Sequence, residues 1–271
     1  MAQFSTAYDT IQKFSNSPVG TLTQTISTRD SYFGPSAFCD FINQLQLKIS
    51  GADISFTAPL FCDTEIKAGK IFLRDMFKLY KYENRLHTML LTGKEIKGYL
   101  EHSYSLWTNQ MQSPEDDLLL FDNQYTGINK KLLYNSYNFD SAMGIKYTVD
   151  VTKPYGNKIN IISMSDGSSF DLDKTYKVAI NSYRANGDDG MLIKGAGIPK
   201  EKIKDRIVKT SDNDLRSDIM QYIHQKGTIT PECKNEWKFI PEEWVAPAIE
   251  RNRNDLFGNI SITNKPSITV H

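Results

Sequence analysis

Residues 86–101 read LHTMLLTGKEIKGYLE, and this stretch decides the fold because a strand pattern passes directly into a helix pattern. Residues 86–91 are a short apolar run that is typical of a buried β-strand. Thr92 and Glu95 then form a capping-box pattern, in which the hydroxyl and the carboxylate bind the first free amides of a helix. One face of that helix carries Ile96, Tyr99, Leu100 and Ser103. The stretch therefore predicts a buried strand that leads into a capped, half-buried helix.

Strand and helix patterns alternate on both sides of this stretch. Helical spacing recurs at Phe38, Phe41, Ile42 and Leu45, at Leu73, Met76, Phe77 and Tyr80, and at Leu215, Ile219, Tyr222 and Ile223. Strands are predicted at residues 19–28, 52–57, 145–151, 159–164 and 176–181, with a turn at Asp166 and Gly167. Residues 110–138 are polar and loop-like. With no internal repeat and no low-complexity linker, the pattern predicts one compact α+β unit.

The charge balance and hydropathy argue against two classes of partner. The 271 residues include 32 basic and 32 acidic side chains, so the formal net charge is zero. A protein that binds a nucleic-acid polymer normally carries a basic excess for the phosphate backbone, so we expect no such partner. No apolar stretch approaches the roughly 20 residues of a membrane span, and none is predicted. The first residues lack the basic and apolar regions of a secretory signal, so no signal peptide is expected in this sequence.

Motifs for metal or nucleophilic catalysis are missing. The four histidines occur singly, at His87, His102, His224 and His271. None lies in the Asp-x-His, Gly-Asn-His or His-x-His arrangements that are used for paired divalent metals. Metal-ligand spacing is also absent from the three cysteines, Cys39, Cys62 and Cys233. We therefore expect no metal cofactor in this chain and no hydrolytic activity from it alone.

Two loops carry residues that suit a flat, polar ligand. In residues 183–190, YRANGDDG, Tyr183 offers an aromatic face and Asp189 a carboxylate for sugar hydroxyls, while the glycines permit a sharp turn. An ordinary strand-to-helix turn would have the same composition. In residues 79–84, LYKYEN, the two tyrosines are either edges of the core or platforms for a base, a stack that gains about 1–3 kcal/mol. The residue patterns leave both alternatives open.

Five motifs follow one another along most of the chain. They are TAPLF at 57–61, LRDMFKLYKYEN at 73–84, TGKEIKGYLE at 92–101, DVTKP at 150–154 and TYKVAINSYRANG at 175–187. In this order and spacing they resemble the C-terminal domain of the 5′-nucleotidase family, nearest to its bacterial 2′,3′-cyclic-nucleotide phosphodiesterase/3′-nucleotidase branch. The resemblance runs from about residue 19 to about residue 241. It implies an α+β fold of layered mixed β-sheets with packed helices.

The resemblance also implies roles for individual residues. In that family a metal-binding N-terminal domain supplies the chemistry, and the C-terminal domain clamps a nucleobase between two aromatic rings. The rings would be Tyr82 and Tyr183, with Asp189 near the ribose hydroxyls. Arg29 would fall where many relatives carry a substrate-facing arginine. Two further motif residues would shape the loops and reach the ligand, Asn84 and Asn186.

Two departures from the family pattern bear on the ligand. The usual Gly-Gly-Asp-Gly is replaced by residues 187–190, GDDG, which add the carboxylate of Asp188 close to the expected site. That carboxylate would weaken phosphate binding or change the preferred ligand. The Asn-Gly-Gly-Gly-Ile-Arg of the 5′-nucleotidase branch is replaced around residues 57–61, so its asparagine and arginine contacts are not carried over.

The resemblance implies a leading interdomain-type helix in 1–18, predicted at 7–15, and a substrate-binding domain in 19–241, and it does not cover the C-terminal tail of unknown role in 242–271. The tail is predicted to be irregular, with one strand at 260–263. The implied function is recognition of a nucleoside or nucleotide for a nucleotidase or cyclic-nucleotide phosphodiesterase. The divalent metal pair would belong to a missing domain or to a separate metallophosphoesterase chain, and the setting would be periplasmic or exported. Two alternatives stay open, a stand-alone nucleoside-binding module and a structural domain whose ligand function has decayed.

Overall fold

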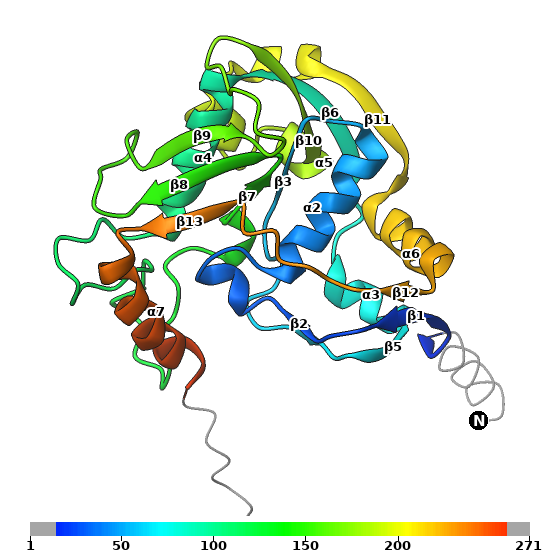
Figure 1. The fold of residues 1–271 in the computed structure, drawn as a ribbon, viewed down its shortest axis with the longest axis horizontal. Helices are drawn as coiled ribbons and strands as arrows, with labels where there is room; N and C mark the ends of the chain where they lie inside the picture. Colours follow the sequence, from blue (N-terminus) through cyan, green and yellow to red (C-terminus); the bar gives the residue numbers. More distant parts are fainter. Residues whose placement is uncertain (1–14, 259–271) are drawn as a thin grey trace, which may run out of the picture.

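The computed structural model describes residues 15–258, which are built around a five-stranded mixed sheet. The strands in spatial order are β11 (Ile207–Asp214), β6 (Arg85–Thr92), β10 (Thr175–Asn181), β3 (Ile54–Thr57) and β7 (Ser141–Met143). Only β10 and β3 are parallel to each other within this sheet. The antiparallel register of β6 and β10 sets Leu86 opposite Asn181. The residues that precede β6 therefore meet the residues that follow β10 (Figure 1).

Three smaller sheets surround this one. The first consists of β13 (Trp237–Ile240), β8 (Ile145–Asp150) and β9 (Ile159–Met164). The second consists of β12 (Thr228–Ile229), β1 (Pro18–Leu22) and β5 (Gly69–Phe72), and the third of β2 (Ile26–Ser27) and β4 (Glu65–Ile66). Parallel and antiparallel pairs again occur together, because β8 is parallel to β13 and antiparallel to β9. The predicted α+β architecture of layered mixed sheets with packed helices is confirmed.

Most of the described helices begin at a Ser, Thr, Asn or Asp whose side chain accepts from an amide of the first turn. The helices are α2 (Ala37–Ser50), α3 (Leu73–Leu79), α4 (Gly93–Trp107), α5 (Ser182–Ala185), α6 (Leu215–Lys226) and α7 (Glu242–Phe257). Short turns of 3₁₀ helix lie at Asp30–Tyr32, Ser136–Asn138, Lys200–Lys202 and Lys204–Arg206, and a π turn lies at Met191–Gly195. The predicted capping box of α4 is confirmed. The Thr92 hydroxyl accepts from the Glu95 amide at 3.2 Å, and the Glu95 carboxylate accepts from the Thr92 amide at 2.7 Å.

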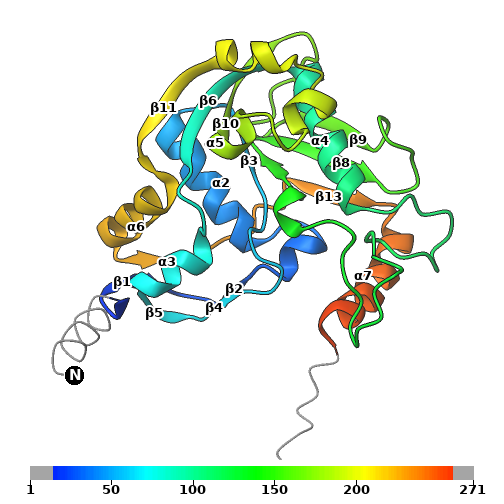
Figure 2. The same ribbon diagram turned by 180° about the vertical axis from the view of Figure 1, so that it is seen from behind.

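Helices α2 and α4 cover opposite faces of the five-stranded sheet. Successive side chains of β3 point to opposite faces. Phe56 stacks on Tyr99 of α4 with ring centroids 4.3 Å apart, whereas the hydroxyl of Ser55 accepts from the Gln46 amide of α2 at 3.0 Å. Figure 1 shows α2 in front of the sheet, and Figure 2, from behind, shows α4 in the foreground.

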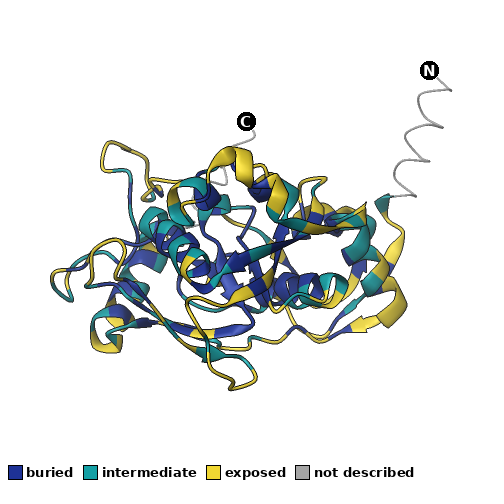
Figure 3. Ribbon diagram, turned by 90° about the horizontal axis from the view of Figure 1, so that it is seen from above, coloured by how far each residue is buried: buried dark blue, intermediate teal, exposed yellow. Residues whose placement is uncertain are grey.

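Two apolar clusters form the interior, which Figure 3 shows in dark blue. One cluster joins α4, α7 and the sheet of β8, and at its centre the Trp107 ring stacks on Tyr104 at 4.8 Å and on Phe139 at 5.4 Å. The other joins α2, α3 and α6 with β1 and β5. Many of the aromatic rings of the chain thus serve to pack the core. None of the helices between residues 15 and 258 is long and apolar enough to cross a membrane.

The prediction of irregular structure after Pro241 is wrong. Helix α7 begins directly after Pro241 and buries Val245, Ala248 and Leu256 in the cluster around Trp107. Its composition hid it, because asparagines and an internal proline, Pro247, disfavour a helix in isolation. Tertiary packing outweighs this low propensity. The strand predicted at 260–263 lies outside the described residues.

Two other local predictions differ in detail from the structure. The single strand predicted at 19–28 is divided into β1 and β2, because these segments pair with different partners, β5 and β4. Phe77, predicted on the apolar face of α3, is 52% exposed, with the Arg216 guanidinium 4.4 Å from its ring centre. The helix predicted at 7–15 lies outside the described residues except for Ser15, which is helical.

One buried acid gives the fold a pH dependence with a definite sign. Asp40 in α2 is 4% exposed, and its carboxylate accepts from the Lys234 amide at 2.7 Å. Burial raises the pKa of Asp40 to about 6, against the opposing effect of the Lys234 amide. Between about pH 4 and pH 6 the folded state therefore binds more protons at Asp40 than the unfolded state does. The free energy of unfolding then falls as the pH rises through that window, because the buried carboxyl loses its proton. We expect Asp40→Asn to gain stability relative to the unmodified protein as the pH rises, by about 1.4 kcal/mol for each unit of the pKa difference.

Urea unfolding of both proteins at several pH values between about 4 and 7 checks this sign. Asp212→Asn is the matched control, because Asp212 is an exposed acid. The control should keep a constant difference from the unmodified protein. A constant difference for Asp40→Asn as well would contradict the prediction.

Candidate functional site

A cleft of about 230 Å³ opens where four chain segments meet. The segments are the loop after β3, the loop between α3 and β6, the stretch before β7, and the passage from β10 into α5. The cleft is lined by Ala58, Leu60, Tyr82, Asn84, Tyr137, Asp140, Asn181, Tyr183 and Arg184. Its wall thus combines aromatic rings, side-chain amides and one carboxylate–guanidinium pair, which suits a flat ligand with polar edges.

Two of the lining tyrosines present their rings to solvent. Tyr82 is 38% exposed and Tyr183 is 43% exposed, whereas Tyr80 in the same loop as Tyr82 is 1% exposed. The sequence left open whether the two tyrosines of this loop pack in the core or offer a surface to a base. Tyr80 packs in the core, whereas Tyr82 lines the cleft. A cation borders each exposed ring, with Lys81 Nζ 5.5 Å from the Tyr82 centroid and Arg184 Cζ 5.6 Å from the Tyr183 centroid.

The strand register and local caps bring the two tyrosine loops together. Ser182 follows β10, and its hydroxyl accepts from the Arg85 amide at 3.2 Å and donates to the Asn84 side-chain oxygen at 3.3 Å. Asn181 caps α5 by accepting from the Arg184 amide at 2.9 Å. The turn after α5 needs Gly187, whose φ is +77° and at which a Cβ would lie 2.4 Å from the Ile203 side chain. Tyr183 is thereby held on a short, capped turn beside Asn84.

A buried ionic network lies behind the cleft. Arg184 Nε donates to Asp140 at 2.8 Å, and Arg184 Nη1 donates to Asp189 at 2.5 Å. The side chains of Arg184 and Asp140 are each 3% exposed, and that of Asp189 is fully buried. Tyr99 also donates its hydroxyl to Asp140, and Asp189 accepts from the Met191 amide at 2.9 Å. Burial raises the pKa of Asp189 despite the nearby guanidinium. One arginine therefore pairs with two buried carboxylates and fixes the loop that carries Tyr183.

Metal ligands do not gather anywhere in the described part of the chain. Between residues 15 and 258, no three His, Cys, Asp or Glu side chains are arranged so that they could hold a metal ion. The described cleft consequently offers binding groups rather than metal ligands.

A comparison of the sequence with known families decides the classification. The family model for "5′-nucleotidase, C-terminal domain" matches residues 18–194, which is more than half of the chain. The chain belongs to this family. The resemblance inferred from the five motifs is thus confirmed for this 5′-nucleotidase C-terminal domain.

The relatives of this 5′-nucleotidase C-terminal domain include nucleotide hydrolases. The trifunctional nucleotide phosphoesterase protein YfkN of Bacillus subtilis is 34% identical over 191 residues, which are 66% of this chain and 12% of the relative. A 2′,3′-cyclic-nucleotide 2′-phosphodiesterase/3′-nucleotidase of Haemophilus influenzae is 27% identical over 193 residues, which are 66% of this chain and 27% of the relative. The chain thus spans only a minor part of the length of these two curated relatives.

Solved structures show the same fold. A 5′-nucleotidase precursor from Thermus thermophilus superposes with a TM-score of 0.64 at 18% identity, over 86% of this chain and 41% of that one. The NAD nucleotidase of Haemophilus influenzae gives a TM-score of 0.60 at 17% identity, over 88% of this chain and 40% of that one. At these identities the likeness concerns the fold alone.

Of the six residues predicted for the site, the structure brings Tyr82, Asn84 and Tyr183 into one cleft. The carboxylate of Asp189 is engaged by Arg184 instead of lining the cleft, so its burial does not favour direct contact with a ribose. The other two predicted residues also lie outside the lining. Arg29 pairs with Asp63 at 2.6 Å, and Asn186 is exposed at the end of α5.

The added carboxylate of Asp188 has a different neighbour from the one expected. Asp188 is exposed and pairs with Lys200 at 2.7 Å, and it is not among the residues that line the cleft. The expectation that Asp188 repels a phosphate in the site therefore has no support in these contacts.

Sequence reasoning missed four polar or aromatic residues of the lining, in addition to the apolar Ala58 and Leu60. Asn181 and Arg184 lie inside the quoted motif at 175–187, where an Asn that precedes a short helix is itself a capping signal. Tyr137 lies in the stretch 110–138, which is predicted to be a loop, and Asp140 follows that stretch closely. No local pattern distinguishes them, because their role depends on contact with α5 across more than forty residues of chain.

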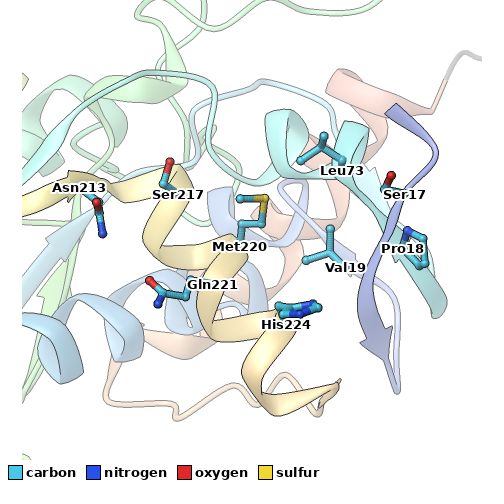
Figure 4. A pocket seen from close by; sticks show the side chains of 9 residues that line it. All are labelled: Ser17, Pro18, Val19, Leu73, Asn213, Ser217, Met220, Gln221 and His224. Atoms are coloured by element: carbon cyan, nitrogen blue, oxygen red, sulfur yellow. The ribbon is translucent and has the colours of Figure 1, made fainter. Parts of the chain in front are cut away.

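A separate hollow of about 550 Å³ lies between β1, the start of α3, and α6. Figure 4 shows Met220 and His224 of α6 facing Leu73 and Val19. Among the described residues that line it there is no Tyr, Phe or Trp ring, and His224 is the one ionisable side chain. The tyrosine cleft, although smaller, therefore suits a nucleobase better.

Proposed function

We propose that the cleft binds a nucleoside or nucleotide, with the base between the rings of Tyr82 and Tyr183. The observation that carries this proposal is that two exposed tyrosines from separate loops line one cleft. Membership of a family whose relatives are named as nucleotide hydrolases supports the same ligand class. Stacking on aromatic rings accepts any base and contributes about 1–3 kcal/mol per base.

The amides in the cleft supply polar recognition of the base. The side-chain oxygen of Asn84 accepts from the Ser182 hydroxyl, and that of Asn181 accepts from the Arg184 amide. Each of these oxygens already accepts one hydrogen bond and has one lone pair left, whereas each amide nitrogen has two N–H groups to donate. We infer that the cleft favours bases that present acceptor atoms, such as ring nitrogens or carbonyl oxygens, at that edge.

Hydrolysis would use a metal pair outside this chain. We infer that the domain recognises substrate for a nucleotidase or cyclic-nucleotide phosphodiesterase, with the metal centre on another domain or on a metallophosphoesterase partner. The much greater length of the curated relatives supports this arrangement. A periplasmic or exported setting remains a prediction from the family resemblance. Activity that appears only on mixing with such a partner would distinguish this role from that of a stand-alone nucleoside-binding module.

Removing one ring of the proposed clamp tests the binding function. Tyr183→Ala should weaken adenosine binding about 5- to 150-fold, because a stack contributes about 1–3 kcal/mol. Tyr183→Phe should bind nearly as well as the unmodified protein, since stacking uses the ring face and not the hydroxyl. Calorimetric titration of the three proteins with adenosine measures the effect.

Tyr155→Ala is the matched control, because Tyr155 is 53% exposed and does not line the cleft. Its affinity for adenosine should equal that of the unmodified protein. If Tyr183→Ala also retained full affinity, the aromatic clamp would be rejected, and family membership would describe only ancestry.

A further inference from the structure

A second hollow, of about 510 Å³, adjoins the tyrosine cleft. Both hollows are lined by Leu60, Tyr82 and Tyr137, so the Tyr82 ring stands at the border between them. Much of the remaining wall comes from the segment 125–137. A ligand longer than one nucleoside can therefore extend from the cleft past Tyr82 into this second hollow.

The second hollow has aromatic surface of its own. Tyr125 is 50% exposed and Tyr134 is 40% exposed. The Tyr125 ring rests against Gly127, where a Cβ would lie 2.4 Å from the ring atoms. Because Gly127 has no side chain, the Tyr125 ring can pack directly against the backbone there, and about half of Tyr125 is still exposed to solvent. A supported and accessible ring is suited to stacking with a base.

Two ammonium groups flank these rings. Lys81 Nζ lies 5.5 Å from the Tyr82 centroid, and none of the ion pairs between residues 15 and 258 involves Lys81. Lys131 Nζ lies 5.5 Å from the Tyr125 centroid and 4.0 Å from Asp122, at the limit of an ion pair. Lys130 differs, because it is paired with two carboxylates at 2.9 Å each. Lys81 and Lys131 are therefore the cations available to an anionic ligand.

We propose that this hollow is a second nucleotide subsite and that the domain takes dinucleotides. The first base lies between Tyr82 and Tyr183, the linking phosphates face Lys81 and Lys131, and the second base stacks on Tyr125. This inference rests on the proposed function, because it needs the first base in the tyrosine cleft. The alternation of ring, cation and ring matches the alternation of base, phosphate and base, whereas a purely apolar partner would leave both ammonium groups without a counter-charge.

Calorimetric titration of the full 271-residue chain tests the second subsite with three ligands: adenosine, adenosine 5′-diphosphate and diadenosine 5′,5′-diphosphate. Affinity should rise in that order. Tyr125→Ala should weaken binding of the dinucleotide about 5- to 150-fold, toward that of adenosine 5′-diphosphate. Tyr125→Phe should keep the dinucleotide affinity. Lys131→Ala should weaken both phosphate-bearing ligands, with a smaller effect at high salt because an exposed charge pair is screened.

The controls separate this inference from the proposed function. Tyr155→Ala and Lys67→Ala replace exposed residues that line neither hollow, and they should leave all three affinities unchanged. If adenosine binding depends on Tyr183 but the dinucleotide binds no more tightly than adenosine 5′-diphosphate, the second subsite is wrong and the cleft proposal stands. The second subsite is equally wrong if Tyr125→Ala retains full dinucleotide affinity. If adenosine does not bind at all, the proposed function fails and the second subsite fails with it.

Discussion

Replacement of Arg184 by methionine is expected to lower the free energy of unfolding by about 3–5 kcal/mol, the range for breaking a buried ion pair from one side. The substitution leaves the carboxylates of Asp140 and Asp189 buried without their shared cation. The loss should shrink at low pH, because the stranded carboxyl groups can then be protonated. Nucleoside affinity should fall as well, since Tyr183 precedes Arg184 on the same short helix. Urea unfolding and calorimetric titration measure the two effects.

Two companion variants show whether the network is responsible. Arg184→Lys keeps the charge but loses the forked geometry that reaches both carboxylates, so it should recover only part of the stability. Arg253→Met removes an arginine that pairs with Asp30, where the two side chains are 42% and 56% exposed, and it should change stability by less than about 1 kcal/mol. Full stability of Arg184→Met at neutral pH would show that the network contributes nothing.

Replacement of Asn252 by alanine is expected to destabilise the fold by about 2–6 kcal/mol, because it leaves two buried backbone donors without a partner at about 1–3 kcal/mol each. The Asn252 side chain is fully buried, and its oxygen accepts from the amides of Leu118 and Leu119 at 2.9 Å and 3.1 Å. Its nitrogen donates to Asp117 at 2.7 Å. Asn252 therefore connects α7 to the long loop that follows α4. Thermal or urea unfolding gives the difference.

Asn254→Ala provides the control on the same helix, two residues further along and exposed. Both variants gain the same helix propensity from alanine, so the difference between them isolates the buried hydrogen bonds. Equal stability of the two variants would mean that α7 does not depend on Asn252 for its attachment.

Tyr183 of the proposed clamp and Asp189 of the buried ionic network show which features of the site could be predicted from the sequence and which could not. Tyr183 is assigned to the site because its motif resembles that of the family, whereas the local residue pattern alone also fits an ordinary turn. Asp189 lies in the same motif, yet the structure uses its carboxylate to hold Arg184. The sequence could not show this use, because the competing carboxylate, Asp140, comes from a loop before β7.

The sequence by itself determined the elements whose physics is local. Residues 86–101 form β6 and α4 as predicted, because a short apolar run and a cap at a helix start depend only on residues a few positions apart. The tertiary structure decided which of these elements meet. The register of β6 against β10 places Tyr82 beside Tyr183, and burial against Trp237 and Phe239 makes a helix of the segment after Pro241. Both outcomes depend on contacts between residues that are far apart in the chain. The free energies of these contacts exceed the local propensities, and no periodic pattern in the sequence indicates them.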